Sequence, residues 1–285
     1  MPYLLVVSLV WAFSFGLIKG RLAGIDPTAV AVLRLVLSLL VFLPFLRLHS
    51  IPGKLQLRLA VIGAVQFGIM YVLYLHAFAY LQAFEVALFT ITTPLFVALL
   101  DSAWERRFVA VHAIAALLSV AGAAVIVWQH GATGGTVLGV LLVQASNLCF
   151  AAGQLAWKKV RPRMAPEIKD SSAFALLYAG AAVSAAAWSL FTTDWLALRL
   201  TATQGVTLAY LGILASGVCF FWWNVGATRV NTGTLAAFNN AKIPLGVACS
   251  LLFFGERTDI PRLLIGGALM AAGVVIAEWR RPKSS

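Results

Sequence analysis

The sequence predicts an all-α integral membrane protein in which ten transmembrane helices form two inverted five-helix repeats around a central cavity. Three observations lead to this prediction. Of the 285 residues, 61% are hydrophobic and only 11% are charged, too few charges to cover a soluble domain. The apolar residues come in runs of about 20, the length that crosses ~30 Å of hydrocarbon. Several residues also recur at a shift of 149 to 151 positions along the chain.

The apolar runs favour helices over a β-barrel, because they are continuously apolar or small rather than alternating. Ten helices of about 20 residues use most of the chain, so no loop can hold a soluble domain. Charged residues, Pro and Gly punctuate the runs. The predicted spans are 3–20, 28–46, 58–81, 84–104, 108–128, 135–157, 171–192, 204–227, 232–254 and 260–279.

The cations predict how the chain is oriented in the membrane. An even number of spans puts both termini on one side, and that side collects fourteen Lys and Arg residues against five on the other. By the positive-inside rule, both termini are expected in the cytoplasm. The fourteen are Arg47, Lys54, Arg58, Arg106, Arg107, Lys158, Lys159, Arg161, Arg163, Lys169, Arg229, Arg280, Arg281 and Lys283.

An internal repeat divides the chain into residues 1–131 and 132–285. An odd number of spans in each half reverses the second copy, so we expect inverted repeats with a binding site at their midplane interface and alternating access between two conformations. The matching residues are Pro94, Glu105-Arg106, Gly122 and Trp128 with Pro244, Glu256-Arg257, Gly273 and Trp279, and Leu59-Ala60, Gly63 and Gly68 with Leu208-Ala209, Gly212 and Gly217.

Several function classes are excluded by what the sequence contains. The net charge of +11 is scattered among loops, so it fits membrane topology and not nucleic-acid binding. The three cysteines, Cys149, Cys219 and Cys249, lie inside spans, where we expect them to pack rather than to bind a metal. No His-Glu-x-x-His or Gly-x-Ser-x-Gly motif is present, so we predict neither an enzyme nor a cofactor. A passive channel remains an alternative.

Lys242 is the sharpest candidate for substrate binding, because it lies about half way along the span 232–254. A charge at that depth costs about 2.5–3.5 kcal/mol, so it needs a polar cavity or a partner. It could bind a carboxylate or carbonyl group of a substrate, with Asn239 and Asn240 orienting the polar end. Alternatively, the asparagines and carbonyls freed at Pro244 hold the lysine.

The first repeat has a corresponding polar stretch in which Thr90 precedes Pro94 by four residues. Each proline removes one helical hydrogen bond and frees a carbonyl, so Pro94 and Pro244 are predicted hinges where two kinked helices meet. Thr90 is a candidate for substrate contact. Bonding of the threonine back to its own helix is the alternative.

Aromatic and amide side chains supply the other candidates. Phe67, Tyr71, Tyr74 and Phe78 follow one helix face, and they either stack on a substrate or pack against neighbours. Trp11 lies at mid-span, away from the membrane interfaces where tryptophan commonly anchors. The remaining candidates are Trp222 and Trp223, which lie with Phe220 at the repeat-related level, and Asn147 and Gln154, seven residues apart on one helix face.

Arg34 lies within the second span, where it could snorkel outward, pair with Glu85 or attract substrate. Acidic residues stay near span ends, and span one has no carboxylate. A proton-driven exporter of organic cations would need a buried acid, so this distribution favours a neutral or zwitterionic substrate.

The Trp-x-x-Ser-Phe segment at Trp11 to Phe15, Arg34, and the pairs Pro94…Glu105 and Pro244…Glu256 resemble the EamA-like branch of the drug/metabolite transporter superfamily. Within that branch the chain is similar to bacterial aromatic amino acid exporters. The resemblance implies export of small metabolites, foremost neutral and aromatic amino acids, across the bacterial inner membrane. Another small metabolite or a drug is the alternative substrate. We expect the protein to act as a monomer whose partners are its substrate and membrane lipid.

Overall fold

A computed structural model describes residues 1–22, 24–81, 83–127, 137–245 and 260–279, and these residues are helical with no strand. The all-α prediction is therefore confirmed. Six helical segments of the described chain are long and apolar enough to cross a membrane, and shorter apolar helices accompany them. The six segments are Pro27–Phe45, Gly53–Ala77, Val137–Arg163, Asp170–Thr192, Ala202–Ala227 and Ile260–Trp279.

The helices of the first half follow the predicted spans to within a few residues. One predicted span, 58–81, is built from two α-helices with a π-helical stretch between them. The predicted span 84–104 is interrupted, because a helix ends at Thr90 and the next begins at Thr93. The elements are α1 (Pro2–Arg21), α2 (Pro27–Phe42), α3 (Gly53–Gly63), the π-helix η3 (Ala64–Ile69), α4 (Met70–Ala77), α5 (Ala83–Thr90), α6 (Thr93–Glu105) and α7 (Ala110–Val127).

The second half has the same interruptions in the corresponding places. A π-helix again divides one span, and a turn at residues 239–241 interrupts the next, after which residues 242–245 are helical. The predicted continuation of that span to 254, together with Cys249, Glu256 and Trp128, lies outside the described residues. The elements are α8 (Val137–Val160), α9 (Asp170–Thr192), α10 (Ala202–Ala209), η5 (Tyr210–Val218), α11 (Cys219–Ala227), α12 (Thr232–Phe238) and α14 (Ile260–Trp279).

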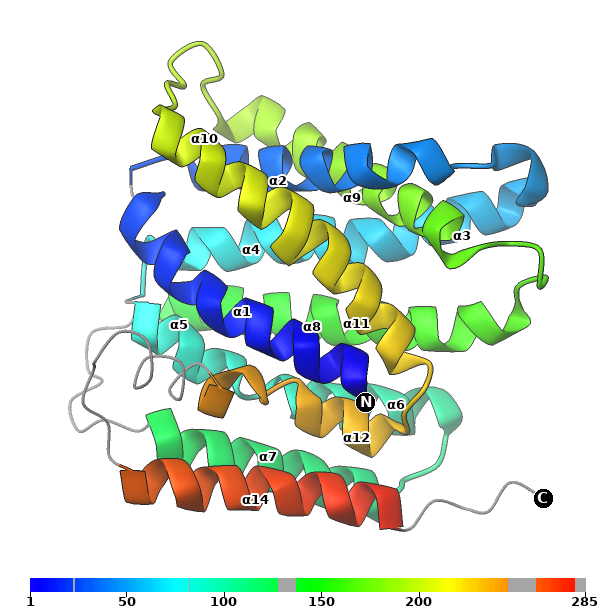
Figure 1. The fold of residues 1–285 in the computed structure, drawn as a ribbon, viewed down its shortest axis with the longest axis vertical. Coiled ribbons are helices and arrows are strands. Elements are labelled where there is room, and N and C mark those ends of the chain that lie inside the picture. Colours follow the sequence, from blue (N-terminus) through cyan, green and yellow to red (C-terminus); the bar gives the residue numbers. More distant parts are fainter. Residues whose placement is uncertain (23, 82, 128–136, 246–259, 280–285) are drawn as a thin grey trace.

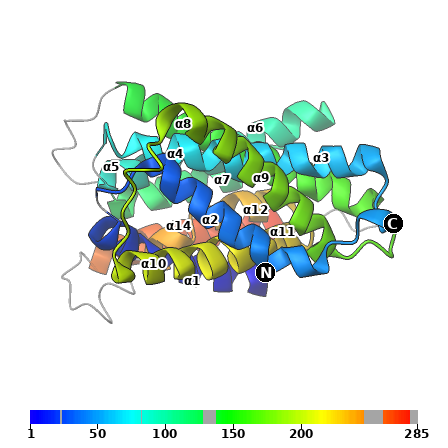
Figure 2. The same cartoon turned by 90° about the horizontal axis from the view of Figure 1, so that it is seen from above.

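Helices that correspond in the two predicted repeats pack against each other at the two edges of the bundle. The pair α2 and α9 lies at one edge and the pair α7 and α14 at the other, with the interrupted helices between them (Figures 1 and 2). Glycine permits the closest approach: a Cβ atom added to Gly122 would lie 2.4 Å from the Gly266 carbonyl oxygen. Small residues of this kind are typical of helix contacts in membranes, where dispersion contacts replace the hydrophobic effect.

Local signals in the sequence explain where several helices begin. Asp26 caps α2, since its carboxylate accepts a hydrogen bond of 2.7 Å from the Ala29 backbone N–H, and Pro27 fills the first helical position. Thr201 and Gln204 form a capping box at the start of α10. Each cap satisfies backbone donors that would otherwise be unpaired at the helix start.

Most described cations lie at one end of the bundle, at the connections α2–α3, α6–α7, α8–α9 and α11–α12 (right in Figure 1). Some are paired: Lys159 is 2.7 Å from Glu105, and Arg161 contacts Asp170. The opposite end carries Arg21, Arg199 and Arg262 among the described residues. This asymmetry is the one the positive-inside argument used, and the cytoplasmic placement of the termini stays a prediction.

Candidate functional site

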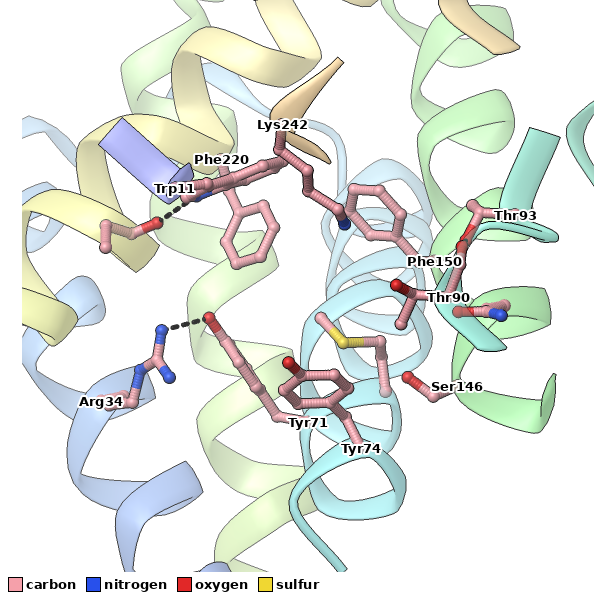
Figure 3. Close-up of a pocket in the computed structure, with 13 residues that line it drawn as sticks. Trp11, Arg34, Tyr71, Tyr74, Thr90, Thr93, Ser146, Phe150, Phe220 and Lys242 are labelled. Atoms are coloured by element: carbon pink, nitrogen blue, oxygen red, sulfur yellow. Dashed lines mark hydrogen bonds between the residues drawn. The ribbon is translucent and has the colours of Figure 1, made fainter. Parts of the chain in front are cut away.

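A cavity lies in the centre of the bundle, where the interrupted helices of both halves meet. Its volume is about 110 Å³, or about 720 Å³ with the space at its mouth. A cavity that holds a single water molecule needs a volume of only ~10–15 Å³, so this cavity is large enough for a small organic molecule. The lining residues are Trp11, Arg34, Met70, Tyr71, Tyr74, Thr90, Thr93, Ser146, Asn147, Phe150, Ala215, Phe220 and Lys242 (Figure 3).

Aromatic rings form one wall of the cavity. The Trp11 ring centroid lies 5.1 Å from that of Phe220 and 6.3 Å from that of Phe150, both in edge-on geometry. The Trp11 Nε1 donates a hydrogen bond of 2.8 Å to the carbonyl oxygen of Ala215, which fixes the ring plane. A wall of this kind offers flat apolar surface for a ring system, with edge-to-face pairs worth about 0.5–1.5 kcal/mol each.

Arg34 lies in the cavity wall and is 3% exposed. Its Nη2 donates to the Tyr71 hydroxyl at 2.7 Å, and its Nε donates to Ser216 Oγ at 3.1 Å. Its carbon Cζ also lies 4.5 Å from the Tyr71 ring centroid. Of the three roles considered for this arginine, outward snorkelling is therefore wrong. The guanidinium is held inside the bundle by neutral hydroxyl groups.

Lys242 also reaches the cavity, from the second half of the chain. Its Nζ lies 5.9 Å from the centroid of the Trp11 ring, and Figure 3 shows the side chain extending towards Phe150 and Thr90. The lining therefore includes two cations, and no carboxylate is found among the described lining residues. The field inside the cavity favours a negatively charged group.

The break between α5 and α6 supplies the polar wall. The Phe89 carbonyl oxygen lies at the end of α5, where the helix is interrupted. It accepts hydrogen bonds from Asn147 Nδ2 at 3.0 Å and from Gln144 Nε2 at 3.2 Å. The Thr93 hydroxyl donates to the Thr90 carbonyl at 2.8 Å. Side chains of α8 and α6 thus satisfy the freed backbone groups. Thr90 and Asn147 remain at the cavity surface.

The structure brings half of the predicted binding residues together and leaves the other half outside the cavity lining. Those that line it are Trp11, Tyr71, Tyr74, Thr90, Asn147 and Lys242. Those outside are Phe78, Gln154, Trp222, Trp223, Asn239 and Asn240.

The amides outside the cavity hold the structure of the broken helices. Asn239 and Asn240 both lie in the turn after α12. The Asn239 side chain donates a hydrogen bond of 2.8 Å to the Leu235 carbonyl of its own helix, and the Asn240 side chain donates one of 2.8 Å to the Ile91 carbonyl, which lies in the turn between α5 and α6. Gln154 accepts a hydrogen bond of 2.8 Å from Trp223 Nε1. Contact of these amides with substrate stays a prediction, and in this structure each of them makes hydrogen bonds inside the protein.

The predicted aromatic stripe is divided by the π-helix η3. A π-helical turn changes the angular register, so Phe67 turns into the core and lies 5.4 Å from Tyr178, stacked. Tyr71 and Tyr74, which follow the π-helix, face the cavity. Phe78 follows the end of α4 and packs on Tyr74 at 5.3 Å. Trp222 does not line the cavity, and its ring centroid lies 6.3 Å from that of Tyr3.

The lining also includes residues that were not among the predicted binding residues. They are Arg34, Met70, Thr93, Ser146, Phe150, Ala215 and Phe220. A mid-span charge was the available signal for Arg34, as for Lys242. Phe220 stands at the repeat-related level already noted for Trp222 and Trp223. Nothing in the sequence distinguishes Phe150 from other apolar residues of α8.

The fold and the site define a multi-pass helical membrane protein with a central cavity for a small molecule. The chain belongs to the EamA-like transporter family, whose family model matches residues 1–128 and 137–279. It is therefore a small-molecule transporter of the drug/metabolite type and not an enzyme.

Three relatives narrow the comparison. A probable biotin transporter of Pseudomonas aeruginosa is 41% identical over 99% of this chain and 98% of its own length. The biotin transporter of Salmonella typhimurium is 39% identical over 100% of this chain and 95% of its own length. A riboflavin transporter of Vibrio cholerae is 26% identical over 92% of this chain and 86% of its own length. These names favour the alternative prediction of another small metabolite over amino acids.

A crystal structure has the same fold, with a TM-score of 0.75, 19% sequence identity, and coverage of 98% of this chain and 96% of the other. At that identity the likeness concerns the fold alone. It agrees with a helical arrangement that extends over almost the whole chain.

Proposed function

We propose that this protein transports biotin, or a closely similar vitamin bearing a carboxylate, through the central cavity. The observation that carries the proposal is an aromatic cavity lined by two cations, Arg34 and Lys242, with no acid among its described lining residues. Biotin is a monocarboxylic acid with a ureido ring fused to a saturated sulfur-containing ring, so it presents one anion at one end, one carbonyl at the other, and apolar ring and chain surface between them. Relatives that are 39–41% identical over nearly their full length carry the name biotin transporter.

The charge of the cavity argues against the neutral or zwitterionic substrate expected from the sequence. A zwitterion brings an ammonium group, which would lie among cations and aromatic edges without a carboxylate from the described residues. A monoanion neutralises one of two buried charges instead. In this proposal Trp11, Tyr71 and Tyr74 contact the ring, Thr90 and Asn147 contact its polar atoms, and Lys242 donates to a carbonyl or carboxylate oxygen.

The transport cycle in this proposal is alternating access. The halves 1–131 and 132–285 rock about the interrupted helices near Pro94 and Pro244, which serve as hinges, and expose the cavity to each side in turn. Both termini face the cytoplasm, as the distribution of cations indicates.

Proteoliposomes test the proposal directly. Purified protein in liposomes should take up radiolabelled biotin saturably, show counterflow with unlabelled biotin, and ignore phenylalanine and leucine. Lys242→Gln should lower the rate at subsaturating biotin by about tenfold, since one charged hydrogen bond is worth about 1.5–3 kcal/mol. Uptake of the amino acids with no uptake of biotin would contradict the proposal. Linear, non-saturable flux would indicate a channel.

A further inference from the structure

We propose that Arg34 forms a carboxylate-binding subsite in the cavity, distinct from the position of Lys242. The inference rests on the proposed function, because it assigns the carboxylate of that substrate to one residue. Arginine suits the role, since its planar guanidinium presents parallel N–H donors to the two oxygens of a carboxylate.

The charge on Arg34 is buried without an anion among the groups that hold it. It lies in the middle of α2 and is 3% exposed, and both of its hydrogen-bond acceptors, Tyr71 and Ser216, are neutral hydroxyl groups. Its Nη1 is buried and makes no hydrogen bond. A buried cation with an unused donor lowers the stability of the protein, and such residues within membrane spans commonly serve a function. A substrate carboxylate would supply both the missing acceptor and the missing charge.

The surroundings of Arg34 hold the guanidinium in a fixed direction. The hydroxyl groups of Tyr71 and Ser216 are hydrogen-bonded to each other, with 3.0 Å between their oxygen atoms, and each also accepts one hydrogen bond from the arginine. Ser38 binds both the Arg34 carbonyl at 2.9 Å and the Gly212 carbonyl at 2.8 Å, which ties α2 to the π-helix η5. Ser216 and Tyr71 use the Nε–H group and one of the two N–H groups on Nη2, so the N–H groups of Nη1 and the second one of Nη2 are left for a carboxylate.

The subsite therefore lies where both halves of the chain meet. Arg34 and Tyr71 belong to the first half, and Ser216 belongs to η5 of the second. Figure 3 shows Arg34 and Lys242 entering the cavity from different sides. A substrate with an anion at one end and a carbonyl at the other would use both residues, the carboxylate on Arg34 and the carbonyl on Lys242.

A comparison of biotin with biotinamide isolates this subsite, because the two ligands share the ring and differ in the charge of the chain end. Affinities are measured by calorimetry on the purified full-length protein in detergent. The wild type should prefer the acid. Arg34→Gln should reduce that preference about 10- to 100-fold, mainly through weaker binding of biotin. Lys242→Gln, the matched control, should weaken both ligands to a similar degree and keep the preference.

Each other outcome overturns a stated claim. If Arg34→Gln keeps the preference for the acid, the subsite is wrong and the proposed function stands. If Lys242→Gln loses the preference instead, the carboxylate belongs to Lys242. If the wild type binds neither ligand, the proposed function fails and the subsite fails with it.

Two further variants cover the case in which Arg34→Gln elutes as an aggregate. Arg34→Lys keeps the charge and loses the planar fork, so the preference for biotin should be intermediate. Tyr71→Phe removes the hydroxyl that holds Nη2 and should also reduce the preference. A wild-type preference in both variants would overturn the subsite.

Discussion

The side-chain amide of Asn240 donates a hydrogen bond of 2.8 Å to the carbonyl oxygen of Ile91. Asn240 lies in the turn after α12, and Ile91 lies in the turn between α5 and α6. One side chain thus joins the two interrupted helices of opposite halves, beside the cavity. The bond satisfies a backbone acceptor that a continuous helix would have used itself.

Loss of this bond should destabilise the protein. Asn240→Leu leaves the Ile91 carbonyl buried without this donor, at a cost of about 1–3 kcal/mol. Thermal unfolding in detergent should show a lower Tm, and transport should slow because the two breaks are no longer held together. An unchanged Tm would mean that another group or water replaces the amide.

A second pair of amides can be tested as a unit. Gln66 and Asn224 are fully buried and exchange two hydrogen bonds, of 2.8 and 3.0 Å. Gln66→Leu and Asn224→Leu should each destabilise by about 1–3 kcal/mol, because each leaves the other amide unpaired. The double variant should cost less than the sum of the two, with a coupling energy of about 0.5–3 kcal/mol. Additive losses would contradict a direct interaction.

Glycine is required where α3 meets α9. A Cβ on Gly63 would lie 1.8 Å from the Leu177 carbonyl oxygen, and one on Gly180 would lie 1.9 Å from the Ala60 carbonyl oxygen. Gly63→Ala should therefore lower the yield of monodisperse protein and its Tm. The added methyl group would collide with the backbone of α9, and neither helix can shift without disturbing its other contacts.

Gly205→Ala is the matched control for that substitution. Gly205 lies inside α10, and an added Cβ there meets nothing within 4 Å. The substitution should raise stability slightly, by about 0.5–1 kcal/mol, through helix propensity alone. Equal losses in both variants would argue against the contact between α3 and α9.

The aromatic wall should contribute to ligand affinity in steps. Trp11→Phe keeps a ring near Phe220 and loses the hydrogen bond to Ala215, so biotin should bind less tightly by about 0.5–1.5 kcal/mol. Trp11→Leu also removes the ring contacts and the face beneath Lys242, and should cost more. Calorimetric titration of both variants measures the difference. Equal affinities for the two would mean that the ring does not contact the ligand.

Much of the fold could be predicted from local features of the sequence. Apolar length and punctuation predicted the spans, because membrane helices are defined by local composition. Pro94 and Pro244 marked both interruptions, since proline acts on its own backbone. The inward placement of Arg34 depends instead on Tyr71 and Ser216, which are 37 and 182 residues away in sequence. No local pattern contains that information.

The sequence predicted only in part which residues line the cavity and which pack inside the protein. The stripe that includes Phe67 and Tyr71 assumed regular α-helical spacing, and the π-helix η3 shifts that spacing within the same span. Trp223 and Gln154 have the residue types of a binding site, yet they pair with each other at 2.8 Å. Sequence alone does not indicate which polar groups find partners inside the protein.

Part of the cavity wall is main chain. Within η5, the oxygens of Ala215, Ser216 and Gly217 accept bonds from the side chains of Trp11 and Tyr178. These acceptors are backbone carbonyl groups, so they remain when the residues that carry them are replaced, provided that η5 stays π-helical. Evolutionary drift can therefore alter the Ala215 side chain while the backbone carbonyl that orients Trp11 persists, and ligand preference can change by exchange of the aromatic residues around an unchanged main chain.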